Sequence, residues 1–265
     1  EEDAGKLIHS EFDNETYPDY NRCGVPLIEI VSEPDFRSAK EVVAYLEKLK
    51  SMCEYLGISD CKMQEGSMRA DVNLSVRKKG DAAFGVRTET KNVNSFRAIE
   101  HAIEFETARQ IDILESGGTV KQETRHWNED RRTGVAMRSK ENAQDYRYFP
   151  DPDLPPVVLS EEYIEQLTSS LPELSEVRRA RFTQEYALSD YAAGRLTASK
   201  ALADLFENTV KLCNEPKETA NWLIECLPKA LDDAGVAFED ADISFETFAE
   251  FIGAIRSKTI NKNVG

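Results

Sequence analysis

The sequence lacks the features of membrane, exported and disulfide-bonded proteins. No apolar run approaches roughly 18 residues and no signal-like segment is present, so we predict neither a membrane span nor export, and expect a cytoplasmic protein. The five cysteines are odd in number and show no CxxC spacing, which argues against both a disulfide framework and a zinc ribbon. We therefore expect reduced, structural cysteines.

Several catalytic signatures are also missing. GxSxG, P-loop and GxGxxG patterns do not occur, so a hydrolase elbow, a Walker ATPase and a dinucleotide site have no support. The three histidines, His9, His101 and His126, lie far apart in the sequence and are interpreted as structural. An initiator Met is absent and the chain opens on a charged run, which predicts a piece of a larger protein.

Positive charge is scarce as well. The chain has 33 Lys and Arg against 49 Asp and Glu, a net charge of −16. Because phosphate contacts are made mainly by Lys and Arg, this balance disfavours non-specific binding to nucleic acid. Any contact with RNA must therefore be local.

The strand and helix signals along the sequence predict an α+β region followed by an all-α region. The Pro-rich run at 151–156 cannot be helical and strand signals stop after Leu159, so a boundary falls between about 156 and 175. The first region alternates strands with helices without a strict βαβ rhythm, which favours a mainly antiparallel sheet. Helices are predicted near 38–56, 95–116, 175–187, 197–213, 216–234 and 244–257, and strands near 27–31, 119–127, 135–139 and 146–149.

A hairpin is predicted by strict alternation of polar and apolar residues. From Glu65 to Arg77 polar residues fall on odd numbers and apolar ones on even numbers; a turn follows at 78–81, and residues 84–91 repeat the parity. In an antiparallel pair, the numbers of two facing residues always add up to the same sum. The two polar sets lie on one face only if this sum is even, and a short turn gives a sum of about 160. Asp71 would then lie opposite or diagonal to Glu89, and Arg69 near Lys91.

The polar face of this hairpin combines carboxylates, cations and amides. Mg²⁺ prefers oxygen ligands, while Arg and Lys neutralise the phosphate that often accompanies it, so the face suits a metal and a phosphate. A solvated sheet face of mixed charge explains the alternation at least as well. The residues concerned are Glu65, Arg69, Asp71, Asn73, Arg87, Glu89 and Lys91, with Asn92 just beyond.

Blocks of sequence resemble a known family. Residues 19–35 read DYNRCGVPLIEIVSEPD, which closely resembles the signature of the GatB family, the B subunits of tRNA-dependent Asp/Glu amidotransferases. The resemblance extends from residue 1 to about 170, with further blocks in the family's order and spacing. These blocks are EEDAGK at 1–6, KMQEGSMRADVN at 62–73, TETKNVNSF at 88–96, QETR at 122–125 and DYRYFPDPDLPP at 145–156.

The resemblance implies two domains. Residues 1–170 would be the C-terminal part of a cradle-shaped catalytic domain, a mainly antiparallel α+β fold related to glutamine synthetase and guanidino kinases. Residues 171–265 would be an all-α helical domain. The N-terminal part of the cradle and the C-terminal tail domain of the family are missing from this sequence, so we expect the polypeptide alone not to perform the full reaction.

The resemblance also implies an activity. Family members use ATP and Mg²⁺ to phosphorylate the side-chain carboxylate of Glu or Asp mischarged on tRNA(Gln) or tRNA(Asn), and ammonia then displaces the phosphate. The ammonia comes from the partner amidase (A) subunit, and a small C subunit completes the complex. The family's metal-binding glutamates fall on Glu2, Glu65 and Glu89. Phosphorylation is chemically reasonable here, because it replaces the poor leaving group of a carboxylate by a good one.

Side-chain chemistry, rather than the family match, assigns the remaining site residues. Arg69, Asp71 and Lys91 are expected to act in catalysis. Asn73, Arg87 and Asn92 are expected to hold ATP or its phosphates and to orient oxygens. Two alternatives remain open: a different carboxylate–amine ligase of the same fold that amidates a free acid without tRNA, and a non-enzymatic tRNA-binding scaffold whose carboxylates are structural.

Overall fold

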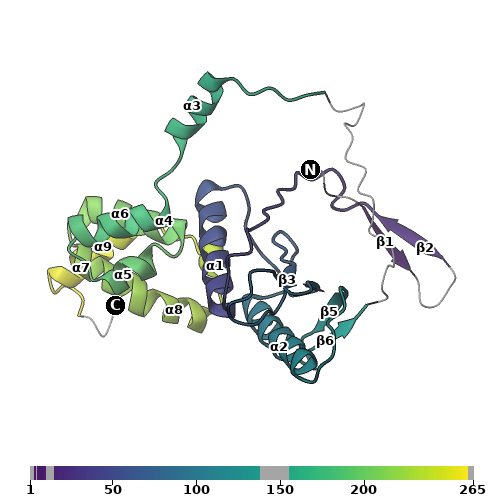
Figure 1. The fold of residues 1–265 in the computed structure, drawn as a ribbon. Helices are drawn as coiled ribbons and strands as arrows, with labels where there is room; N and C mark the ends of the chain where they lie inside the picture. Colours follow the sequence, from purple (N-terminus) through teal and green to yellow (C-terminus); the bar gives the residue numbers. More distant parts are fainter. Residues whose placement is uncertain (1–2, 4, 10–14, 138–154, 262–265) are drawn as a thin grey trace. The chain divides into compact units, whose positions relative to one another are not determined.

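The computed structural model describes residues 3, 5–9, 15–137 and 155–261. The chain divides into two compact units, Glu1–Ser38 and Ala39–Gly265 (Figure 1). The predicted strand at 146–149 lies outside the described residues.

The first unit contains a short antiparallel hairpin. Its strands are β1 (Lys6–His9) and β2 (Thr16–Asp19), paired so that Ile8 faces Tyr17. The strand predicted at 27–31 is not part of either described sheet, and Ile28 and Val31 are 71% and 81% exposed, so that prediction was wrong. An apolar run forms a strand only where a neighbouring strand pairs with it, which the sequence pattern does not reveal.

The second unit begins with two helices and a four-stranded sheet. The strand order is β3-β4-β5-β6; β3 pairs antiparallel with β4, β5 pairs antiparallel with β6, and β4 and β5 run parallel. The mixed α/β composition agrees with the predicted α+β class. The elements are α1 (Ala39–Leu56), β3 (Val72–Leu74), β4 (Thr88–Lys91), α2 (Phe96–Glu115), β5 (Thr124–Asn128) and β6 (Thr133–Ala136).

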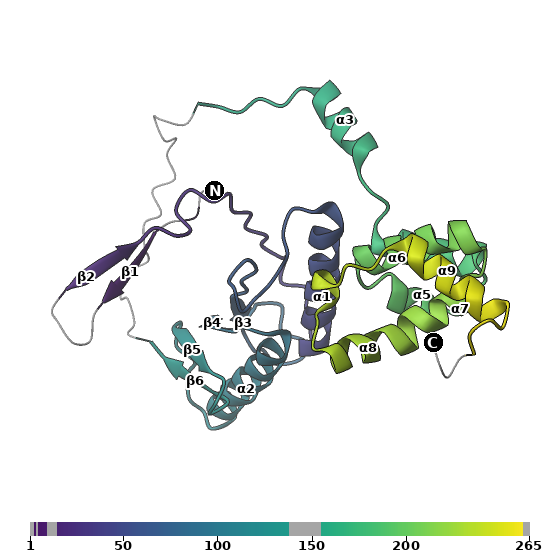
Figure 2. The same ribbon diagram turned by 180° about the vertical axis from the view of Figure 1, so that it is seen from behind.

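Helix α2 lies beside this sheet in both views (Figures 1 and 2). The hydroxyl of Ser95 caps its first turn by accepting a hydrogen bond from the Ala98 amide at 3.0 Å, as the sequence predicts for a helix start. Its apolar side chains, including Ile99 and Ala102, pack with Trp127 of β5 and with α1 in one core. On the opposite face of the sheet, the side chains of Asn73 and His126 are exposed.

Helices form the rest of the second unit. Its core is built around the buried rings of Phe182 and Phe206, whose centroids lie 4.9 Å apart. The four predicted helical segments are confirmed. The elements are α3 (Glu161–Ser170), α4 (Ser175–Glu185), α5 (Asp190–Leu196), α6 (Lys200–Cys213), α7 (Pro216–Asn221), a π-helix η1 (Trp222–Cys226), α8 (Leu227–Ala234), a 3-10 turn η2 (Phe238–Asp240) and α9 (Phe245–Arg256).

The segment predicted as one helix at 216–234 contains a π-helical turn. The Leu227 amide donates its hydrogen bond to the Trp222 carbonyl, five residues back. Pro228 follows at once, and a proline inside a helix has no amide to donate and crowds the carbonyl four residues earlier. The wider turn accommodates this conflict without ending the helix.

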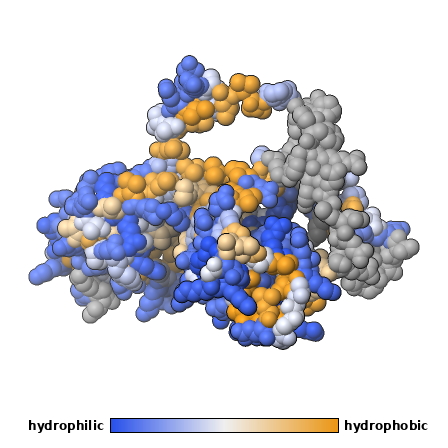
Figure 3. Space-filling model, viewed as in Figure 1, coloured by the Kyte–Doolittle hydropathy of each residue, from blue (hydrophilic) through white to orange (hydrophobic). Residues whose placement is uncertain are grey.

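Helix α3, which the sequence pattern did not predict, exposes an apolar stripe. Tyr163, Ile164 and Leu167 are each close to half exposed, and none of the α3 residues is buried (Figure 3). Within the described part of the chain, no helix combines the length and apolar character needed to cross a membrane.

Candidate functional site

The faces predicted for the hairpin are confirmed over its centre. Val72 and Leu74 on β3 pack into the core, and Thr88 and Thr90 on β4 are fully buried. The odd-numbered residues between them point to the outer face. The numbers of facing residues on β3 and β4 have an even sum, as predicted. The register differs by two residues from a pairing of Asp71 with Glu89, so that Asn73 lies directly opposite Glu89.

The ladder is shorter than the alternation predicted. Glu65 lies in a turn rather than on β3, because Gly66 adopts a left-handed conformation (φ +79) and the Ser67 amide bonds back to the Lys62 carbonyl at 3.1 Å. The Glu65 carboxylate there accepts a hydrogen bond from the Lys62 ammonium at 3.2 Å. On the other arm, Phe84 is 56% exposed instead of facing the core.

The centre of the outer face is an ion cluster around Lys91. Its ammonium lies 2.8 Å from the Asp71 carboxylate and 3.3 Å from that of Glu89. The other oxygen of Glu89 accepts a hydrogen bond from the Thr124 hydroxyl on β5 at 2.9 Å. Burial alone would lower the pKa of Lys91, but hydrogen bonds and charge from Asp71 and Glu89 outweigh it and raise that pKa. Lys91 is therefore a cation held between two anions.

This arrangement predicts the effect of Asp71→Asn. The substitution removes one of the two carboxylates that raise the Lys91 pKa, so that pKa should fall toward its ordinary value. Titration of the Lys91 side chain by ¹⁵N NMR measures it directly. Asp81→Asn, which changes an exposed acid in the hairpin turn, should leave the Lys91 pKa unchanged. An unshifted Lys91 pKa in Asp71→Asn would contradict the described ion pair.

The stabilising effect of this ion pair has a definite pH range. Because folding raises the Lys91 pKa, the contribution of Lys91 protonation to stability is fully present below the ordinary pKa of lysine, and it is lost as the pH rises through the raised value.

Asn92 joins the end of β4 to β5. It has a left-handed backbone (φ 66), and its amide nitrogen donates to the Trp127 carbonyl at 3.1 Å and lies 3.2 Å from Nε2 of His126. His126 is exposed and faces Lys91 across the parallel pairing of the two strands. The sequence pattern did not identify Thr124 and His126 as neighbours of the cluster, because period-two alternation does not specify the next strand of a sheet.

Of the other predicted site residues, Asn73 lies on β3 opposite Glu89, and the rest lie outside the two strands. Arg69 precedes β3 and Arg87 immediately precedes β4, and both are exposed, as is Asn73. Glu2 lies outside the described residues. Within the described ranges, no set of three or more His, Cys, Asp or Glu side chains is placed to hold a metal ion.

The donor chemistry of the cluster nevertheless suits a hard cation. Asp71 and Glu89 offer carboxylate oxygens and Asn73 an amide oxygen, which are the ligand types of Mg²⁺. Two carboxylates and one ammonium also leave an excess of negative charge at this point of the face. The roles of these residues stay predictions.

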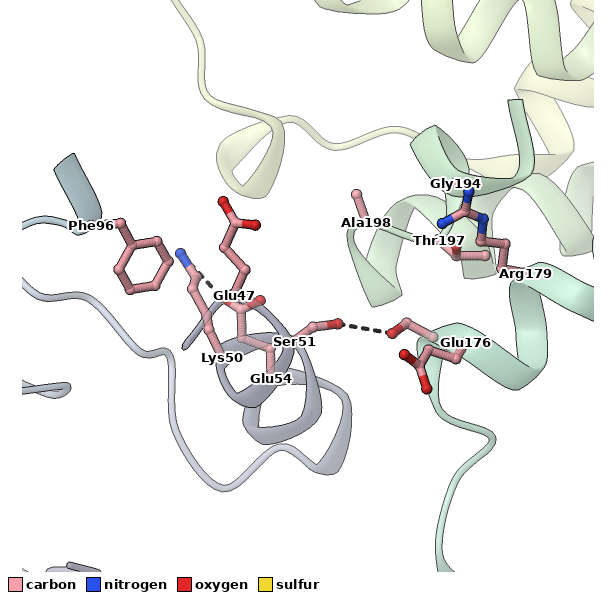
Figure 4. A pocket seen from close by; sticks show the side chains of 11 residues that line it. Glu47, Lys50, Ser51, Glu54, Phe96, Glu176, Arg179, Gly194, Thr197 and Ala198 are labelled. Carbon is pink, nitrogen blue, oxygen red and sulfur yellow. Dashed lines mark hydrogen bonds and ion pairs between the residues drawn. The ribbon is translucent and has the colours of Figure 1, made fainter. Parts of the chain in front are cut away.

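A separate hollow lies between α1 and the helices that follow α3. It is lined by Glu47, Lys50, Ser51 and Glu54 of α1 and by residues of α4 and the end of α5. The Ser51 hydroxyl points toward α4 and donates to that of Ser175 at 3.0 Å (Figure 4). The cations around it are paired with acids, Lys50 with Glu54 and Arg179 with Asp190. This balance is typical of a contact between helices rather than of an anion site.

Comparison with known proteins identifies two matching regions. Residues 1–165 match the family model described as the GatB/GatE catalytic domain, and residues 204–265 match the model described as the GatB domain.

Curated relatives match along the whole chain. The B subunit of the aspartyl/glutamyl-tRNA(Asn/Gln) amidotransferase of Lachnoclostridium phytofermentans is 55% identical over 264 residues, which are 100% of this chain and 55% of the relative. The protein of the same name from Lachnospira eligens is 54% identical over 98% of this chain and 55% of its own length. That of Hahella chejuensis is 53% identical over 98% of this chain and 54% of its own. The chain thus spans about half the length of these relatives.

Proposed function

Because this chain belongs to the GatB/GatE family, we propose that it is part of an enzyme subunit that amidates aminoacyl-tRNA. The observation that carries the proposal is the match of residues 1–165 to the catalytic domain of that family. The substrate would be Glu-tRNA(Gln) or Asp-tRNA(Asn), in keeping with the names of the relatives.

The reaction we propose activates a carboxylate. The side-chain carboxylate of the esterified Glu or Asp receives a phosphoryl group from ATP, and ammonia then displaces the phosphate to give the amide. No protein nucleophile is needed, so the residues of this chain act by binding, orienting and neutralising charge. Mg²⁺, when bound, would offset the repulsion between the phosphates and the carboxylate.

The ion cluster supports roles for three residues. Glu89 and Asp71 would supply oxygen ligands to Mg²⁺, and Lys91 would contact the transferred phosphoryl group. An ammonium has three donor hydrogens, of which two are directed at carboxylates here, so a phosphate could be bound with little rearrangement. By their chemistry, Arg69 and Arg87 would bind phosphate and Asn73 and Asn92 would orient oxygens. Glu2 and Glu65 join the metal ligands by family resemblance alone.

Domains and partners follow the same proposal. Residues 1–170 would belong to a cradle domain with the glutamine synthetase and guanidino kinase type of fold, and residues 171–265 to a helical domain. The designation of the relatives as B subunits indicates a multi-subunit enzyme. We propose an amidase A subunit as the source of ammonia, a small C subunit, and the mischarged tRNA as partners.

The test uses the full-length protein assembled with its A and C partners. We expect conversion of Glu-tRNA(Gln) or Asp-tRNA(Asn) to the amidated form with glutamine, dependent on both ATP and Mg²⁺. Amidation of free glutamate or aspartate at the same rate without tRNA would indicate a different carboxylate–amine ligase. Binding of tRNA without ATP turnover would indicate a scaffold, and either outcome would overturn the proposal.

A further inference from the structure

A buried carboxylate lies directly behind the ion cluster, on the other side of the sheet. Glu106 on α2 is 2% exposed, and its Oε1 accepts a hydrogen bond from the Thr88 hydroxyl of β4 at 2.7 Å. Arg109 donates to both Glu106 oxygens, at 2.7 and 2.8 Å, and Arg125 of β5 lies 3.3 Å from Oε2. Residues from one helix and two strands therefore converge on this carboxylate.

Gln110, one turn further along α2, binds the main chain where β3 ends. Its amide nitrogen donates to the Leu74 carbonyl at 3.3 Å, and its amide oxygen accepts from the Val76 amide at 3.0 Å. The same nitrogen also lies 2.9 Å from the Thr88 hydroxyl oxygen and 2.9 Å from Oε1 of Glu106, so that its two hydrogens are shared among these acceptors. Where the pairing of β3 with β4 ends, the Gln110 side chain thus forms hydrogen bonds with the main chain at Leu74 and Val76.

These contacts fix which way the neighbouring side chains point. Side chains alternate along a strand, so holding Thr88 against α2 obliges Glu89 to face outward, and a one-residue slip would reverse the two faces. Likewise, holding the main chain after Leu74 fixes the direction of Asn73, which lies opposite Glu89. The site residues are therefore aligned by contacts made on the inner face.

We propose that Glu106 and Gln110 are positioning residues that align Glu89, Lys91, Asp71 and Asn73 for the reaction, acting through Thr88 and the β3 main chain without touching substrate. This inference rests on the proposed function for the reaction that is aligned. The alignment itself follows from the hydrogen bonds alone.

The ionised form of Glu106 suits this role. Burial alone would raise its pKa, but hydrogen bonds from Arg109, Gln110 and Thr88 outweigh burial and lower it. The carboxylate is thus an acceptor for every one of these donors at neutral pH. A charge held by so many donors is costly to displace, which keeps the helix and the strands in one arrangement.

The decisive variants remove the hydrogen bonds of Thr88 and Gln110 and leave the charge of Glu106 in place. Thr88→Val keeps the shape of the side chain and deletes the hydroxyl that binds Glu106, whereas Thr88→Ser keeps the hydroxyl. Gln110→Met deletes both amide contacts to the β3 main chain. Thr209→Val is the matched control, because Thr209 is also fully buried but lies on α6, and its hydroxyl has no hydrogen-bond partner among the described residues.

Each variant is assembled as the full-length protein with its A and C partners. The measurements are kcat for ATP-dependent amidation per folded molecule, the Mg²⁺ concentration giving half the maximal rate, and amide hydrogen exchange at Val76 and Glu89. For Thr88→Val and Gln110→Met we expect kcat to fall by at least about tenfold and the required Mg²⁺ concentration to rise, because small misplacements of reacting groups are costly. Protection of the Val76 amide should be lost in Gln110→Met.

Thr88→Ser and Thr209→Val should keep kcat within about twofold of the parent value. If Thr88→Val and Gln110→Met keep the parent kcat and Mg²⁺ dependence and lose only thermal stability, the network is structural and the inference is wrong. If the parent complex itself shows no ATP-dependent amidation, the proposed function fails instead. The exchange of the Val76 amide then still decides whether Gln110 holds β3.

Discussion

If the proposed function is right, Glu89→Gln should lower ATP-dependent amidation by the full-length complex at least about a hundredfold, because it removes the carboxylate that we propose as a ligand of Mg²⁺ while keeping the shape of the side chain. Glu89 is in the middle of the ion cluster, 3.3 Å from Lys91 and bonded to Thr124 at 2.9 Å. A neutral amide there would hold Mg²⁺ poorly and leave Lys91 with Asp71 as its remaining anion in the cluster. The rate of ADP formation with mischarged tRNA measures the phosphorylation step.

Two controls make the Glu89 result specific. Glu104→Gln removes the same charge from an exposed position on α2 and should leave ADP formation unchanged. Hydrolysis of glutamine by the amidase partner should persist in Glu89→Gln, since that chemistry belongs to another polypeptide in our proposal. Normal ADP formation in Glu89→Gln would show that Glu89 is not part of the phosphorylation site.

Phe206→Ala should destabilise the helical region by about 3–5 kcal/mol, the usual cost of deleting a fully buried aromatic ring. The Phe206 ring lies 4.9 Å from that of Phe182 and 5.3 Å from that of Tyr186, and both contacts would be lost. Phe206→Leu, which retains most of the buried volume, should cost clearly less. Chemical denaturation gives the total loss of stability.

Amide hydrogen exchange would show which helices are destabilised by Phe206→Ala. The helical core and the core beneath the sheet contain separate sets of buried residues, one around Phe206 and one around Ile99. We therefore expect Phe206→Ala to weaken amide protection in α6 while protection in α2 is retained. Equal loss in both helices would show that the two cores unfold together, and would contradict the domain division proposed near residue 170.

Alternation in the sequence was enough to predict which side chains share a face of the hairpin. Parity along a strand is a local property, so Asp71 and Glu89 could be placed together from residue numbers alone. The length of the ladder was not predictable in this way. Gly66 allows a left-handed turn that removes Glu65 from the strand, although the alternation continues through it.

Pairing beyond the hairpin depends on contacts between distant residues. The parallel neighbour of β4 is β5, which brings Thr124 beside Glu89, and the sequence contains no local signal for that choice. The predicted strand at 27–31 failed for the same reason, since its apolar pattern did not specify a partner. Helices were predicted better, because their caps and periodicity are local, although the seven-residue helix α5 was too short to show a period.

The sequence does contain a pattern that indicates the buried polar pair on α2, Glu106 and Gln110. Ile99, Ile103, Glu106 and Gln110 follow one another at helical spacing, so the apolar stripe of α2 continues into two polar residues on the same face. Polar residues in a core-facing stripe require buried partners. That observation predicts an internal hydrogen-bond network, but the strands supplying the partners had to be seen in the structure.

Because Gln110 and Glu106 hold both arms of the hairpin, the turn between them is not needed to set the register of β3 and β4. In many hairpins the length of the turn sets the register of the strands. Here the first arm is held at Leu74, the last residue of β3, and at Val76 just beyond it, and the second arm is held at Thr88 of β4, so both arms are anchored to α2 independently of the chain that joins them. Insertions or deletions near the turn at 78–81 should therefore leave the arrangement of the outer face unchanged.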